Sequence, residues 1–239
     1  METQDFYGED LSFEGQSMAP AERIEAGVVE LFVDIETIPG PVRPDPSTLT
    51  PPANYKKPES IAQWQEENAE TVYRKQALDP MQGQICSIAW AFDAGPVFTA
   101  AIGVCCDDEQ QVFETFTAAV LEGHKGREIQ WIGHNLEFDL GFIWKRSFKY
   151  KNAGFLRSMI PRERWSKNLI DTLKLWQFGR ELVGLGDLAH FLGLEGKTGS
   201  GSEVFDMFQA GQYTEIADYN RADVELTRRV YRILTGGVP

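Results

Sequence analysis

The segment VVELFVDI at residues 28–35 is the feature that most limits how this chain can fold. Its nearly continuous run of apolar side chains, rich in Val and Ile, is typical of a strand that is buried on both faces. Asp34 and Glu36 stand at its end. Because residues i and i+2 of a strand point to the same face, both carboxylates are expected to project together. The sequence therefore predicts an acidic pair at the end of a buried strand.

The remainder of the chain alternates between strand and helix patterns. Residues 84–92 and 96–104 predict two strands joined by a short Asp-Ala-Gly turn, and 128–133 and 168–173 predict two more. Predicted helices cover 59–77, 108–122, a segment that starts near Asn135, 184–193, 201–210 and 213–235. Strands first and alternation with helices afterwards indicate the α/β class, with a mixed β-sheet flanked by α-helices.

Two segments lack a regular pattern. Residues 1–26 are acidic and have little periodicity, which predicts a mobile N-terminal arm. Residues 27–239 are then expected to form a single domain with a Pro-rich insertion at about 39–58, where seven prolines exclude regular structure. An insertion of this length beside the strand that carries the acidic pair is more often functional than passive.

Composition narrows the classes of protein that the chain can be. A formal charge of −13 argues against a protein that coats a phosphate backbone by bulk attraction. No stretch approaches eighteen apolar residues and no signal peptide is visible, so we predict no membrane association. Three cysteines without a C-x-x-C pair predict neither a disulfide framework nor a zinc site. A cytoplasmic location is the expectation.

Further carboxylates lie at helical spacing from a polar partner. Asn135 and Asp139 are four residues apart, and so are Tyr219 and Asp223, so each pair shares one face of its helix. Ordinary explanations stay open for both pairs: a helix cap with a solvated aspartate, and a packed tyrosine with an ion-paired aspartate. Asp171 is a fifth candidate carboxylate, for which hydrogen bonds to the backbone at a strand end are favoured over a metal role.

The ordered set of these motifs resembles the tyrosine branch of the DEDD 3′–5′ exonucleases, in the ribonuclease H-like superfamily. Asp34 and Glu36 match the first motif, 135–139 the second and 219–223 the third. The chain looks most like the stand-alone exonucleases related to the exonuclease domain of family-B DNA polymerases, from about residue 28 to 235. Further matching segments are 77–80, 171–173, 188–194 and 196–204.

This resemblance implies a ribonuclease H-like fold and hydrolysis of phosphodiester bonds from the 3′ end of DNA, with single-stranded DNA favoured as substrate. It also implies two ions, Mg²⁺ or Mn²⁺, held by Asp34, Glu36, Asp139 and Asp223. Hard oxygen ligands of this kind suit magnesium. Tyr219 would orient the attacking water or help to remove its proton.

Contacts with the substrate are expected from Asn135, Lys197, Lys145 and Arg146. The basic segment 145–167 is interleaved with aromatic residues, which suits a guide for single-stranded nucleic acid or, alternatively, a solvated surface. An RNA-trimming exoribonuclease and a non-catalytic nucleic-acid-binding module remain alternative functions. Proofreading or DNA repair would involve a separately encoded polymerase or another replication or repair factor.

Overall fold

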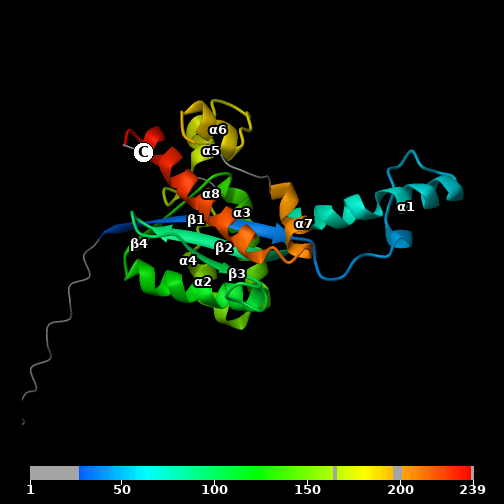
Figure 1. Ribbon diagram of the computed structural model, residues 1–239, viewed down its shortest axis with the longest axis horizontal. Helices are drawn as coiled ribbons and strands as arrows, with labels where there is room; N and C mark the ends of the chain where they lie inside the picture. Colours follow the sequence, from blue (N-terminus) through cyan, green and yellow to red (C-terminus); the bar gives the residue numbers. More distant parts are fainter. Residues whose placement is uncertain (1–26, 164–165, 196–200, 238–239) are drawn as a thin grey trace, which may run out of the picture.

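The computed structural model describes residues 27–163, 166–195 and 201–237 (Figure 1). These residues form one five-stranded mixed sheet and eight α-helices, with the strand order β3-β2-β1-β4-β5. The strands are β1 (Val28–Ile38), β2 (Gln84–Phe92), β3 (Phe98–Ala101), β4 (Glu128–Gly133) and β5 (Leu169–Asp171). The central strand β1 is antiparallel to β2 and parallel to β4. The predicted α/β class, a ribonuclease H-like mixed sheet flanked by helices, is confirmed.

Helices cover both faces of this sheet (Figure 1). They are α1 (Pro58–Lys75), α2 (Glu109–His124), α3 (Leu136–Arg146), α4 (Gly154–Met159), α5 (Thr172–Trp176), α6 (Leu185–Phe191), α7 (Val204–Gln209) and α8 (Tyr213–Leu234). Within the described residues, no helix is both long enough and apolar enough to cross a membrane. The predicted N-terminal arm, residues 1–26, lies outside the described part of the chain.

Strand β1 is buried on both faces, as its apolar run predicts. Leu31 and Val33 belong to the larger hydrophobic core, which α2 and α3 cover. Phe32 points the other way and packs with Val224 of α8. The alternation places Asp34 on the same face as Phe32, so this carboxylate faces α8.

Differences from the predicted bounds have local causes. Strand β1 continues to Ile38 beyond an irregularity in its pairing with β2 at Glu36 and Thr37. Strand β3 ends early, at Ala101, and Gly103 then adopts a positive φ of 77° beside the ring of Tyr213. The strand predicted to run to residue 173 ends at Asp171, and the five-residue helix α5 follows.

The Pro-rich insertion and α1 extend away from the end of the sheet at which β1 ends (Figure 1). Among residues 39–57 only a short 3-10 turn, Pro46–Thr48, is regular, in agreement with the prediction. One contact closes the base of this projection on itself, and another joins it to α7. Tyr73 Oη donates a hydrogen bond to the Gly40 carbonyl at 2.9 Å, and the Arg74 guanidinium pairs with Asp206 of α7.

Candidate active site

Three carboxylates meet where β1 passes under α8. Asp34, Glu36 and Asp223 each offer one oxygen atom, and these atoms lie within 4.8 Å of one another. Glu36 and Asp223 are buried, and Asp34 is half-buried. Like charges at this separation repel unless a cation lies between them. Carboxylate oxygens are also the hard ligands that Mg²⁺ and Mn²⁺ prefer, so the donor set fits a divalent ion.

Asp139 of α3 lies next to this cluster and is bonded to the β1 backbone. Its Oδ1 accepts a hydrogen bond from the Ile35 N–H at 3.0 Å, between Asp34 and Glu36. Burial raises the pKa of Asp139 well above its ordinary value, and the nearby charge of Asp34 adds to this increase, whereas the Ile35 N–H opposes it. An ionised Asp139 is therefore costly unless a cation is near.

Tyr219 and Asp223 are one turn apart on α8. The ring of Tyr219 is half-buried and packs against the small hydrophobic cluster that contains Ile38 and Ile216. Because residues four apart on a helix share a face, α8 turns both side chains toward the end of β1. Tyr219 and Asp223, the last two residues of the predicted site, therefore both come from α8, the helix that packs over Asp34 and Glu36.

Asp34 is positioned by two buried residues that the sequence motifs did not indicate. One bonds Asp34 directly, and the second bonds the first. The Asn220 side chain is fully buried, and its Nδ2 donates a hydrogen bond to Asp34 Oδ2 at 2.6 Å. Ser87 Oγ in turn donates to Asn220 Oδ1 at 2.6 Å. Ser87 is paired with Glu36 in the register of β1 and β2, so it belongs to the same face of the sheet. Asn220 is a polar residue within the apolar stripe of α8, and this interruption is the sequence feature that could have indicated it.

Asp171 organises the N-terminus of α3. Its Oδ1 accepts hydrogen bonds from the Asn135 and Leu173 N–H groups at 2.9 and 3.0 Å, and its Oδ2 accepts one from the Leu136 N–H at 3.1 Å. The favoured interpretation of Asp171, as a strand-end residue bonded to backbone, is confirmed. Asn135 has an exposed side chain and a positive φ of 59°, a conformation that asparagine tolerates better than most residues.

The prediction that Arg146 contacts the substrate is wrong. Its side chain is only 4% exposed and pairs with Glu109, and it also donates to the Pro80 carbonyl at 3.3 Å. Because these bonds occupy the guanidinium inside the protein, it does not reach a phosphate group. Lys145, the preceding residue, is exposed. Lys197 lies outside the described residues.

The basic segment is only partly a surface feature. Tyr150 Oη donates to Glu109 at 2.6 Å, and burial raises the pKa of this phenol well above its ordinary value. Arg157 donates to the Ser147 carbonyl at 2.6 Å and lies over the ring of Phe148. These residues tie the segment to its own fold, so they cannot all follow a nucleic-acid strand.

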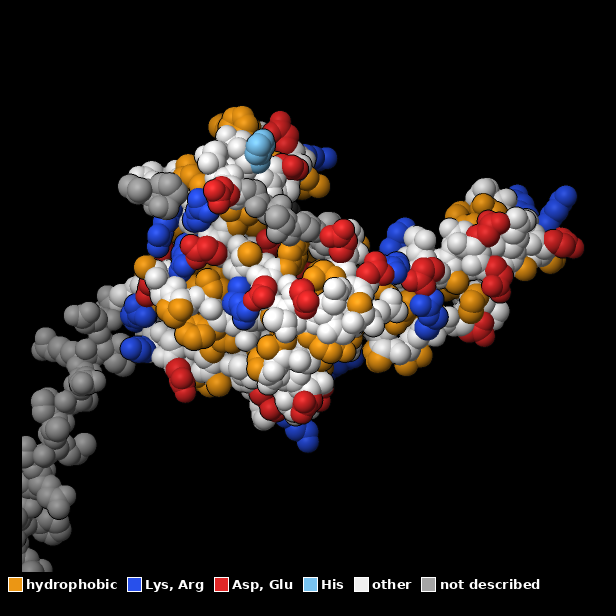
Figure 2. All heavy atoms as spheres, in the orientation of Figure 1, with side chains coloured by type: hydrophobic (Ala, Val, Ile, Leu, Met, Phe, Trp, Pro, Cys, Tyr) orange, Lys and Arg blue, Asp and Glu red, His pale blue; other side chains and the backbone are white. Residues whose placement is uncertain are grey.

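On the face shown in Figure 2, acidic and basic side chains are interspersed over the body and the α1 projection. This mixture agrees with the overall charge of −13. Attraction of a polyanion to this face is therefore weak, and binding of nucleic acid would depend on local contacts near the carboxylates.

Comparison with known families relates the chain to a group of exonucleases. The model of a family described as "Predicted 3'-5' exonuclease related to the exonuclease domain of PolB" matches residues 78–235, more than half of the chain. The match includes Asp139, Tyr219 and Asp223, and it begins after Asp34 and Glu36. No curated protein matches the chain.

Proposed function

The chain belongs to the family of predicted 3′–5′ exonucleases related to the exonuclease domain of PolB, and from this membership we propose that it shortens DNA strands from the 3′ end with two divalent ions. The observation that carries the proposal is the convergence of Asp34, Glu36 and Asp223 within 4.8 Å. Single-stranded DNA is the proposed substrate, and the relationship of the family to the exonuclease domain of PolB supports this choice. Residues 27–239 are the proposed exonuclease domain.

In this proposal each carboxylate has a separate task. Asp34 would contribute to both ion sites, Glu36 and Asp223 would help to hold the ion that activates the attacking water, and Asp139 would support the second ion directly or through water. Bound Mg²⁺ or Mn²⁺ would lower the pKa of the attacking water and stabilise charge on the leaving oxygen. The burial of Glu36 and Asp223 supports these roles, since few waters then compete for their oxygens.

Tyr219 is proposed to orient the attacking water. A phenol hydroxyl can both donate and accept a hydrogen bond, so it can hold a water molecule in one orientation. Tyr219→Phe is expected to lower kcat by on the order of 10²-fold, the lower end of the range for a group that handles a proton, while KM stays the same. Steady-state kinetics on a 5′-labelled strand measure this. An unchanged kcat, or weaker binding of Mn²⁺ by calorimetry, would contradict the orienting role.

Asn220 is proposed to position Asp34 for its ligand role. The amide bond to Asp34 Oδ2 fixes the orientation of this carboxylate. Asn220→Ala should weaken Mn²⁺ binding by about tenfold or more, as for other residues that orient metal ligands. Isothermal titration calorimetry is the measurement, and Ser87→Ala should have a smaller effect in the same direction. Thr214→Ala on the exposed side of α8 is the matched control. If wild type and all variants bind Mn²⁺ with equal affinity, Asn220 does not position a metal ligand.

The direct test of the reaction compares DNA with RNA of the same sequence. Both strands are labelled at the 5′ end and incubated with the purified protein in Mg²⁺, in Mn²⁺ or in chelator. We expect metal-dependent shortening that is faster for DNA. Faster shortening of RNA would favour the exoribonuclease, and binding without shortening in either metal would favour the non-catalytic module.

A separately encoded polymerase, or another replication or repair factor, is the proposed partner for proofreading. The relationship of the family to the exonuclease domain of PolB supports this partner. Co-purification of a polymerase with the tagged full chain is the expected observation. If the protein degrades strands at full rate and no polymerase co-purifies, an independent role in repair or degradation replaces proofreading.

A further inference from the structure

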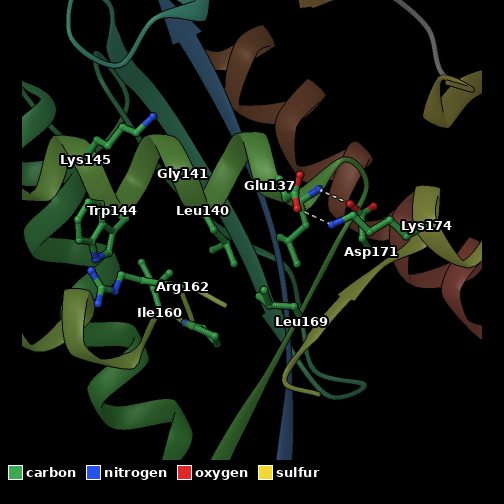
Figure 3. Close-up of a pocket in the computed structure, with 12 residues that line it drawn as sticks. Glu137, Leu140, Gly141, Trp144, Lys145, Ile160, Arg162, Leu169, Asp171 and Lys174 are labelled. Carbon is green, nitrogen blue, oxygen red and sulfur yellow. Dashed lines mark hydrogen bonds and ion pairs between the residues drawn. The ribbon is translucent and has the colours of Figure 1, made fainter. Parts of the chain in front are cut away.

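A pocket of about 430 Å³ lies beside α3 (Figure 3). Its wall is mostly apolar, and the residues at its two ends are charged. The apolar lining consists of Leu136, Leu140, Trp144, Ile160, Pro161 and Leu169. Arg162 lies at one end, beside Trp144, and Glu137, Asp171 and Lys174 lie at the other; Lys145 points away from Arg162 on the far side of α3 (Figure 3).

This pocket lies on the side of α3 that faces away from the carboxylate cluster. Successive residues of an α-helix are rotated by about 100°. Glu137, Gly141 and Trp144 all line the pocket, and by this rotation each is within about 40° of the direction opposite Asp139. One helix therefore presents Asp139 to the cluster and the pocket lining to the other side, so the pocket is a separate site.

The charges at the two ends differ. At one end Lys174 Nζ contacts Glu137 Oε1 at 2.7 Å, which neutralises both groups. At the other end the Arg162 guanidinium lies 5.5 Å from the centre of the Trp144 ring, and Arg162 is exposed. The pocket thus combines an apolar, aromatic wall with one exposed cation, Arg162, at the end away from Lys174.

We propose that this pocket binds one unpaired nucleotide, with the base against Trp144 and Leu140 and the phosphate beside Arg162. An aromatic base with a phosphate group has the shape and charge that this lining accepts, and stacking of this kind tolerates any base. The nucleotide comes either from the substrate strand, upstream of its 3′ end, or from free nucleoside monophosphate. The inference deepens the proposed exonuclease function and rests on it for the choice of a nucleic-acid ligand.

Gly141 allows the pocket to be filled without disturbing the core. A Cβ atom built at this position meets nothing within 4 Å. Gly141→Leu would therefore extend into the pocket, and leucine is also a better helix former than glycine. Gly141→Ala gives a matched control, because it improves the helix but leaves most of the pocket open. Arg162→Ala removes the cation proposed to hold the phosphate.

The test measures binding in chelator, so that neither metal nor turnover contributes. Equilibrium dialysis gives the affinity of the full chain for dAMP and for a single-stranded DNA of about ten nucleotides. We expect Gly141→Leu to weaken binding by about tenfold or more, which is within the range for loss of one stacked base. Arg162→Ala should weaken it less, and Gly141→Ala should bind as the wild type does.

Each outcome has a defined meaning. Weaker binding of the strand alone identifies an upstream nucleotide, and weaker binding of dAMP alone identifies the free nucleotide. Equal binding of both probes by Gly141→Leu and Gly141→Ala overturns the pocket proposal, even if the wild type shortens DNA normally. If the wild type shortens no strand but Gly141→Leu still weakens binding, the exonuclease proposal fails and the pocket proposal stands.

Discussion

Asp34→Asn is expected to reduce metal-dependent shortening of a DNA strand by about 10³-fold or more in kcat/KM. The substitution keeps the shape of the side chain but removes its charge from the group of three carboxylates. Charge stabilisation by a catalytic metal amounts to several kcal/mol, and each ~1.4 kcal/mol corresponds to a factor of ten in rate. Initial rates on a 5′-labelled strand, followed on a denaturing gel, give the ratio to wild type.

The matched control for this substitution is Asp218→Asn. Asp218 is an exposed acid on α8 that pairs with Arg221, so it changes the total charge equally but lies outside the cluster. The control should keep wild-type activity. Thermal unfolding adds a readout that does not need turnover, since Mn²⁺ should raise the Tm of the control but not of Asp34→Asn. If Asp34→Asn keeps its activity within tenfold of the wild type, Asp34 is not the central metal ligand.

Arg146→Met is expected to lower the free energy of unfolding by about 3–5 kcal/mol, because it leaves the carboxylate of Glu109 buried without its cation. In the native protein Glu109 is 5% exposed and joins α2 to two other elements. It accepts hydrogen bonds from the Ile85 N–H at 2.8 Å and from Tyr150 Oη at 2.6 Å. Urea denaturation measures the change, and the Tm should fall by roughly 10 °C or more.

Two comparisons separate this effect from simple loss of a salt bridge. Arg146→Met with Glu109→Gln should recover part of the loss, since the double variant no longer buries an unpaired charge. Lys167→Met removes an exposed partner of Glu128, whose Oε1 lies 3.5 Å from the lysine, and should change stability by less than about 1 kcal/mol. Similar effects of Arg146→Met and Lys167→Met would contradict the structural role assigned to the buried pair.

Much of the candidate site could be predicted because it depends on local periodicity. The strand period of two puts Asp34 and Glu36 on one face, and the helix spacing of four does the same for Tyr219 and Asp223. The bounds of β2 and β4 were correct, because both are apolar runs between clear turns. Helix α5 was missed, since its five residues are too few to show a helical period.

Long-range contacts account for the errors. Arg146 lies within a run of basic residues, which favours a solvated surface, but its partner Glu109 comes from another helix. No local pattern reveals such a pairing. The same is true of Asn220, whose partner Asp34 is 186 residues away in the sequence. Both contacts exist only once α8 and α3 have packed against the sheet.

The most direct test of the exonuclease proposal compares linear and circular single-stranded DNA of the same sequence in Mg²⁺ or Mn²⁺. An enzyme that removes nucleotides from the 3′ end needs that end. We therefore expect the linear strand, labelled at its 5′ end, to yield a ladder of products that shorten progressively, while the circle stays intact. Cleavage of the circle, or release of the 5′ label as a mononucleotide before the strand shortens, would contradict a 3′–5′ exonuclease.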